Sequence, residues 1–170
     1  MATNNNQFIE FFGYGTDRDP KMMKAVIGRV PKGYPATIEG FELCVQSWNE
    51  IPEEAKKILS PPWDSSFKSY VLRPTLKQNK RVRGTVWLIT PQERKLIDNW
   101  ELVGKWYHVF VLRIDTHDNL PKQIEIQVVY DQNIKKVVHG EYYRNYIASK
   151  SKILDLAEKV RNDYLKEHIN

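Results

Sequence analysis

Residues 8–28 have the sequence FIEFFGYGTDRDPKMMKAVIG, and this stretch decides the fold expected for the start of the chain. The short aromatic run Phe8–Phe12 predicts a buried strand. A helix is predicted to begin at Asp19 and Pro20, because Asp is a preferred N-cap and Pro suits the first helical position. Gly28 can close this helix. The stretch therefore predicts a strand, a tight loop and a helix, and such a loop can direct several backbone N–H groups at one point.

Further elements are expected along the rest of the chain, and two of them are predicted to pair. We expect the strands at 69–76 and 83–89 to form a hairpin around a basic turn. The segment Thr90-Pro91-Gln92-Glu93 predicts a helix start with a capping box, in which Glu93 reaches back to Thr90. The remaining predictions are strands at 40–45, 107–114 and 124–130, and helices at 52–59, 90–101 and 149–167.

The order of these elements lacks a regular alternation of strand and helix. It favours an α+β fold with a largely antiparallel or mixed sheet, which could curl into a barrel. Neither a repeat nor a linker is visible, so we expect a single domain over residues 1–170 that ends in a helix at about 149–167.

The composition fits one compact domain with a sizeable core. The chain has 170 residues, of which 41% are hydrophobic and 28% charged, and this balance is unlike that of a disordered protein. Cys44 is the only cysteine, so an intrachain disulfide is excluded. No signal peptide and no apolar run of membrane-spanning length is visible. We therefore expect a cytoplasmic protein.

The formal net charge of +5 raises the question of a nucleic-acid partner. The densest basic cluster comprises Lys77, Lys80, Arg81 and Arg83, and no aromatic residues are interleaved with it. A solvated turn is the favoured interpretation and a nucleic-acid surface the less favoured one.

Glu101 is the first candidate for chemistry. It is predicted at the C-terminal end of a helix, next to Trp100. The negative end of the helix dipole and an apolar neighbour both disfavour a charged carboxylate, so its pKa should be raised, as a general base requires. The pattern alone favours the alternative, an exposed Glu at a frayed helix end.

The loop Gly13-Tyr14-Gly15-Thr16 is the second candidate. Two glycines allow close backbone approach, so the loop could hold a carboxylate or an oxyanion; the alternative is a tight turn out of the strand. The histidines lack metal-ligand spacing, so no metal is expected. Arg144 could reach a substrate carboxylate, although its aromatic-rich surroundings favour packing.

Five motifs in order resemble the gamma-glutamyl cyclotransferase-like family, whose broader group includes plant proteins named for avirulence induction. The similarity extends over about residues 8 to 130. The motifs are Tyr14-Gly15-Thr16, Gly40-Phe41-Glu42-Leu43, Val82-Arg83-Gly84-Thr85-Val86-Trp87, Leu96-Ile97-Asp98-Asn99-Trp100-Glu101, and Tyr107.

The resemblance implies a small mixed, mainly antiparallel β-barrel with flanking helices, whose cavity holds a γ-glutamyl group. Glu101 matches the family's acid/base. The loop residues Tyr14, Gly15 and Thr16 match its substrate-binding loop, and Tyr107 matches an aromatic that borders the cavity.

Two residues after the loop depart from the family pattern. Asp17 and Arg18 stand where relatives usually have Leu or Asn-Leu. Asp17 could repel a substrate carboxylate, whereas Arg18 could bind one, so both are candidate substrate-binding residues.

The resemblance thus predicts an enzyme that cyclises a γ-glutamyl amide to 5-oxoproline, without a cofactor, and releases an amine or amino acid. The alternative is a non-catalytic module that binds a small molecule or a peptide end in the same cavity.

Overall fold

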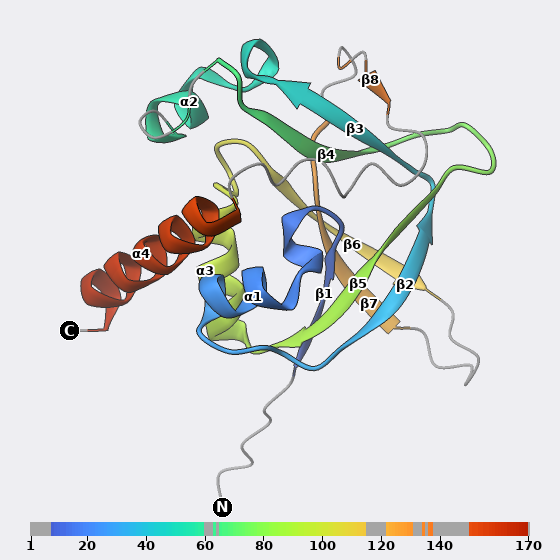
Figure 1. Ribbon diagram of the computed structural model, residues 1–170. Coiled ribbons are helices and arrows are strands. Elements are labelled where there is room, and N and C mark those ends of the chain that lie inside the picture. Colours follow the sequence, from blue (N-terminus) through green and yellow to red (C-terminus); the bar gives the residue numbers. More distant parts are fainter. Residues whose placement is uncertain are drawn as a thin grey trace, which may run out of the picture.

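The protein combines two β-sheets with helices on one side. The computed structural model describes residues 8–59, 63, 65–114, 122–130, 134, 136–137 and 150–169. Figure 1 shows the two sheets one above the other, with the longer helices beside the lower one. The strands are β1 (Ile9–Gly13), β2 (Gly33–Glu39), β3 (Phe41–Ser47), β4 (Lys68–Pro74), β5 (Arg81–Ile89), β6 (His108–Ile114), β7 (Lys122–Val128) and β8 (Lys136–Val137). The helices are α1 (Pro20–Ile27), α2 (Glu53–Leu59), α3 (Pro91–Trp100) and α4 (Lys150–His168), with 3₁₀ turns η1 (Thr16–Arg18) and η2 (Trp48–Glu50).

The larger sheet has the strand order β2-β5-β1-β7-β6. Its pairs are antiparallel except that β1 runs parallel to β7. The α+β class with a mainly antiparallel sheet is therefore confirmed. The described strands form two sheets and no closed barrel, so the barrel stays a prediction.

The predicted hairpin of residues 69–76 and 83–89 is wrong. β4 pairs with β3 in the smaller sheet, whereas β5 pairs with β2 and β1 in the larger one. The segment from β2 to β3 and the segment from β4 to β5 pass between the sheets at the same place. There, Gly40 has a φ of 81° and its carbonyl accepts from the N–H of Thr75 at 2.9 Å. The basic segment is thus a bend between two sheets, because the strand after it finds its partners in distant segments.

Strand β2 was not predicted, and its side chains explain why. Of its residues, only Ile38 is buried, and the strand contains Pro35. Its position at one edge of the larger sheet accommodates both features, since an edge strand can lack one ladder hydrogen bond.

The two helix starts predicted from local sequence are confirmed. The Asp19 side chain accepts from the N–H of Lys21, and Gly28 ends α1 with a φ of 91°. At α3, the N–H of Thr90 donates to Glu93 Oε2 at 2.8 Å, and the N–H of Glu93 donates to Thr90 Oγ1 at 3.2 Å.

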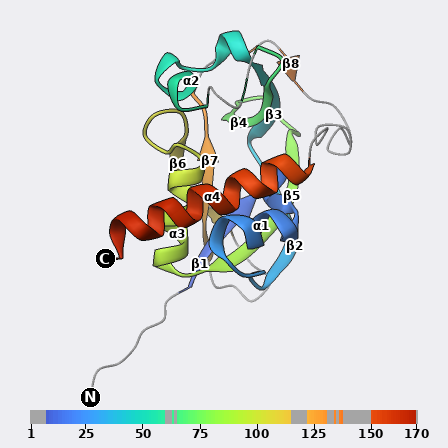
Figure 2. The same cartoon turned by 60° about the vertical axis from the view of Figure 1, so that its left-hand side comes forward.

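Helix α4 lies across α1 and α3, as Figure 2 shows. Its side chains Ala157, Ile153 and Leu165 join a core cluster with Met23 of α1 and Ile97 of α3. In addition, Arg161 donates to the carbonyls of Lys24 and Ala25 at the end of α1. No helix in the described part of the chain is long and apolar enough to cross a membrane.

The strand that contains Cys44 is buried, as predicted, and Cys44 itself has no exposed surface. In the basic cluster, Lys77 and Lys80 pair with the buried carboxylate of Glu42, and Arg81 pairs with Glu39. These carboxylates neutralise part of the positive charge of the bend.

Candidate active site

The loop after β1 is folded tightly against the larger sheet. A Cβ on Gly13 would lie 2.7 Å from the carbonyl oxygen of Asp17, so this close approach requires glycine. The same carbonyl accepts from the indole Nε1–H of Trp87 on β5 at 2.7 Å. Trp87 therefore fixes the loop from the strand beside β1.

The carboxylate of Asp17 accepts a hydrogen bond from a backbone N–H of this loop. Its Oδ1 accepts from the N–H of Gly15 at 2.8 Å. Burial raises the pKa of Asp17 to about 6, while the N–H groups of Gly15, Tyr14 and Asp17 itself, together with Arg18, oppose that rise. The loop thus directs N–H groups at one point, as the sequence predicts, and a carboxylate of the chain itself lies there.

Glu101 lies at the end of α3, where its N–H donates to the carbonyl of Ile97 at 2.9 Å. The residue is half-buried, so it keeps contact with solvent although protein surrounds its carboxyl. Burial and the nearby charge of Asp17 raise the pKa of Glu101 to about 8. The pKa is raised, as predicted, but the second cause of the rise is the charge of Asp17. Trp100 instead packs against the cluster below α4.

Tyr14 and Tyr107 complete the site with two buried hydroxyl groups. Tyr14 donates to the carbonyl of Gln127 at 2.7 Å, and Tyr107 donates to the carbonyl of Tyr70 at 3.1 Å. Burial raises the pKa of both phenols well above the ordinary value, and the charges of Asp17 and Glu101 add to the rise. These mutual influences indicate that the two tyrosines and the two carboxyls lie near one another.

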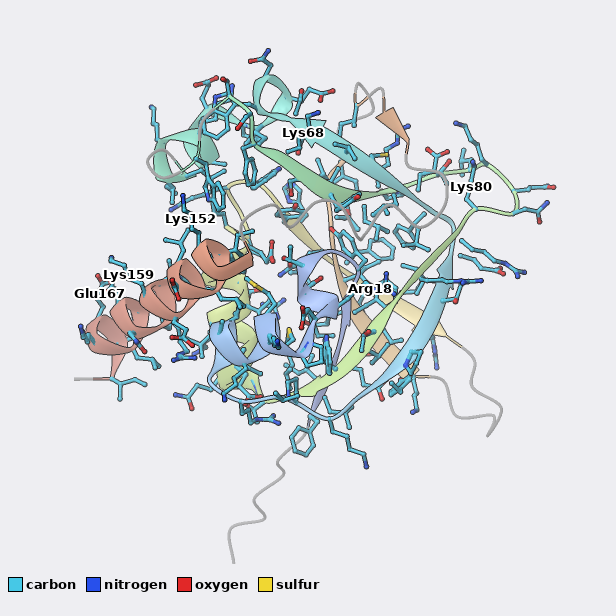
Figure 3. All side chains as sticks on the ribbon, viewed as in Figure 1. Arg18, Lys68, Lys80, Lys152, Lys159 and Glu167 are labelled. Carbon is cyan, nitrogen blue, oxygen red and sulfur yellow. The ribbon has the colours of Figure 1, made fainter. Side chains whose placement is uncertain are left out.

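The other predicted residues, Gly15, Thr16 and Arg18, belong to the same loop and are half-buried. Gly15 faces Tyr70 and Asp17, and the carbonyl of Thr16 accepts from the N–H of Asp19 at 3.1 Å. Arg18 lies near the centre of the view in Figure 3, away from Lys80 at the outer bend. Arg144 lies outside the described residues.

Sequence reasoning missed the supports of the tyrosines. The Ser69 hydroxyl lies 3.2 Å from the Tyr107 hydroxyl, and β7 supplies the Gln127 carbonyl to Tyr14. A backbone carbonyl leaves no trace in sequence, so the Gln127 and Tyr70 carbonyls could not have been predicted as partners. Trp87, in contrast, belongs to a quoted motif, and its indole N–H was a visible signal.

The described residues contain no group of three His, Cys, Asp or Glu side chains that could hold a metal ion. The site as described therefore offers carboxyl groups, phenols and backbone N–H groups. Such groups can exchange protons with a bound molecule and orient it.

Gly15→Val is expected to weaken ligand binding by at least about tenfold while the protein stays folded. A Cβ at Gly15 would meet only Asp17 Oδ1 at 3.8 Å and Tyr70 Cβ at 3.9 Å, which are ordinary contacts. The added methyl groups would cover the approach to Asp17, because two branches at Cβ restrict the side chain. Calorimetric titration with 5-oxoproline, beside thermal unfolding, measures both effects. Unchanged affinity would remove this loop from the site.

The titration of Glu101 should make stability depend on pH. Its folded pKa of about 8 exceeds the value of about 4.3 in an unfolded chain. The proton is therefore held more tightly in the folded state. The resulting stability is fully present below the unfolded pKa and is lost as the pH rises through about 8.

Between pH 5 and pH 9, the wild type should lose at least about 1 kcal/mol relative to Glu101→Gln, which cannot titrate. Urea unfolding of both proteins at several pH values measures this difference. Parallel pH profiles for the two proteins would contradict the raised pKa.

Solved structures with the same fold were found at low sequence identity. An uncharacterized protein from Homo sapiens aligns with a TM-score of 0.58 at 14% identity, over 95% of this chain and 86% of that one. A protein from Arabidopsis thaliana aligns with a TM-score of 0.56 at 13% identity, over 98% and 88% of the two chains. A structure named gamma-glutamyl cyclotransferase aligns with a TM-score of 0.55 at 14% identity, over 95% and 86%. These similarities concern the fold alone.

A comparison with curated protein sequences gives no match. Residues 11–133, in contrast, match the family described as Gamma-glutamyl cyclotransferase, AIG2-like. The match includes the loop after β1, the motif around Gly84, and Glu101. This chain therefore belongs to the gamma-glutamyl cyclotransferase, AIG2-like family.

Proposed function

We propose that this protein is a γ-glutamyl cyclotransferase-type enzyme that converts a γ-glutamyl amide to 5-oxoproline and releases an amine or amino acid. The observation that carries the proposal is Glu101, a half-buried carboxyl with a raised pKa beside Asp17 and two tyrosine hydroxyls. In the described part of the chain, Glu101 has no ion-pair partner. A carboxyl in this state can both accept and return a proton near neutral pH.

The proposed reaction is an intramolecular acyl transfer. The substrate's α-amine attacks its own γ-carbonyl carbon, a C–N bond closes the five-membered ring, and the original amide C–N bond breaks. Glu101 accepts one proton from the attacking nitrogen and delivers one to the leaving nitrogen. Ring closure is favoured when the substrate is held folded, because the two reacting atoms are then already close.

The remaining candidate residues orient the substrate in this proposal. Tyr14, Gly15, Thr16 and Tyr107 line the site around Glu101, and Arg18 is the candidate partner for the substrate's α-carboxylate. Proton transfer and ring closure use only the substrate and Glu101, so the reaction requires no cofactor. We propose the cytoplasm as its location, on the basis of the single cysteine in the sequence.

The proposal is tested by measuring 5-oxoproline release from a panel of γ-glutamyl amides that differ in the leaving group. Release that depends on Glu101 supports it. Absence of release from every member of the panel would contradict it.

One observation favours the alternative, a binding module without turnover. The Gly15 N–H, which could otherwise receive a substrate oxygen, already donates to Asp17. Saturable binding of a γ-glutamyl compound that remains intact after prolonged incubation would support this second candidate.

A further inference from the structure

The carboxylate of Asp17 is held in place from several directions. Its Oδ1 accepts the Gly15 N–H at 2.8 Å, and its backbone carbonyl accepts the Trp87 indole N–H at 2.7 Å. The Gly13 backbone lies close on a third side, since a Cβ on Gly13 would lie only 3.0 Å from Asp17 Cγ. Asp17 is therefore a fixed part of the site and not a surface residue free to turn away.

This carboxylate places a negative charge at the N–H group of Gly15. Glu101 is the second carboxyl, and the other titratable groups that act on the pair are the Tyr14 and Tyr107 hydroxyls and the Arg18 guanidinium. An anion that enters beside Gly15 would need the Gly15 N–H as a donor, but Asp17 already accepts from that group. An ammonium group, in contrast, would gain a charge-assisted hydrogen bond from Asp17.

We propose that Asp17 is a positioning and specificity residue whose carboxylate receives the α-ammonium group of the substrate beside Glu101. The site then selects γ-glutamyl compounds with a free α-amino group over otherwise identical compounds without one. This inference rests on the proposed function, since it concerns the γ-glutamyl group of that substrate. The ammonium is held next to Glu101, which takes one of its protons and leaves the nitrogen lone pair free to attack.

The binding test uses two ligands that differ only in the α-amino group, γ-glutamyl-anilide and glutaryl-anilide. Binding is measured by calorimetry with the Glu101→Gln protein, because this substitution suppresses turnover. The Glu101→Gln protein should bind the amino compound at least about tenfold more tightly, the range expected for a charged hydrogen bond. Adding Asp17→Asn should reduce this preference about tenfold, while the Asn Oδ1 can still accept from the Gly15 N–H.

Asp19→Asn is the matched control, because it removes one negative charge from the same loop at the N-cap of α1. It should leave the ligand preference unchanged. If Asp17→Asn fails to fold, the preference can be followed by pH in the protein that keeps Asp17. It should decline as the pH is lowered from 7.5 to 5, since the pKa of Asp17 is about 6. A preference that persists through both changes overturns the proposal, as does binding of neither ligand.

A ligand-free measurement completes the test. Asp17→Asn should lower the pKa of Glu101, measured by NMR of its side-chain carboxyl carbon, because one of its two causes is removed. Burial should keep that pKa above the ordinary value. An unchanged pKa overturns the inference even when the wild type releases 5-oxoproline. Conversely, wild-type protein that shows the ligand preference but releases no 5-oxoproline disproves the proposed function and supports the role of Asp17.

Discussion

Glu101→Gln is expected to lower the turnover of an active γ-glutamyl amide by about 10²- to 10⁴-fold, the range for a positioned proton-transfer group. The amide has nearly the same shape as the carboxyl but cannot exchange a proton at neutral pH. Burial and Asp17, which raise the pKa of Glu101, act on its charge and do not depend on its size. Ligand binding should therefore change far less than turnover. Steady-state 5-oxoproline release and calorimetric binding separate the two effects.

Glu158→Gln is the control for this experiment. Glu158 is exposed on α4, and the same chemical change there should leave turnover unaffected. Near wild-type turnover by Glu101→Gln would show that the acid/base is another residue.

Gly84→Ala is expected to destabilise the protein by about 3 kcal/mol or more, the cost of forcing an atom into a packed core. A Cβ at Gly84 would lie 2.4 Å from the carbonyl oxygen of Gly13 and 2.4 Å from Cζ of Phe12. Phe12 has no exposed surface, so its ring cannot move aside. The loop after β1 follows directly on Gly13, and the substitution should therefore disturb the candidate site as well as the sheet.

Gly15→Ala is the matched control, since a Cβ there meets no atom closer than 3.8 Å. It should cost less than about 1 kcal/mol. Urea unfolding of both variants gives the two free energies. Equal losses for the two substitutions would contradict the close packing between β1 and β5.

Local sequence was a reliable guide where a residue's partner lies within one helical turn. Asp19 and Thr90 cap their helices as predicted, because each side chain bonds to a backbone N–H two or three residues away. Glu101 was identified in the same way, since its place at the end of α3 follows from that helix start and the apolar face of the helix. The resemblance of the motifs to a family then added the acid/base role, which stays a prediction.

Sequence failed where the partner is distant. The turn residues at 77–80 and the strands on either side of them were predicted correctly, but the pairing of those strands was not, because pairing depends on which distant segments lie alongside. The strand β2 gave no pattern, since an edge strand with Pro35 and one buried side chain carries little apolar alternation.

The sequence by itself determined the helix starts, the glycine-rich loop after the first strand, and the carboxyl at the end of α3. The tertiary structure alone decided that Asp17 lies close enough to raise the pKa of Glu101, and that Tyr14 and Tyr107 are buried within reach of both charges. The physical reason is the range of each interaction. Capping acts over a few residues of chain, whereas burial and charge act through space between segments that only the folded sheets bring together.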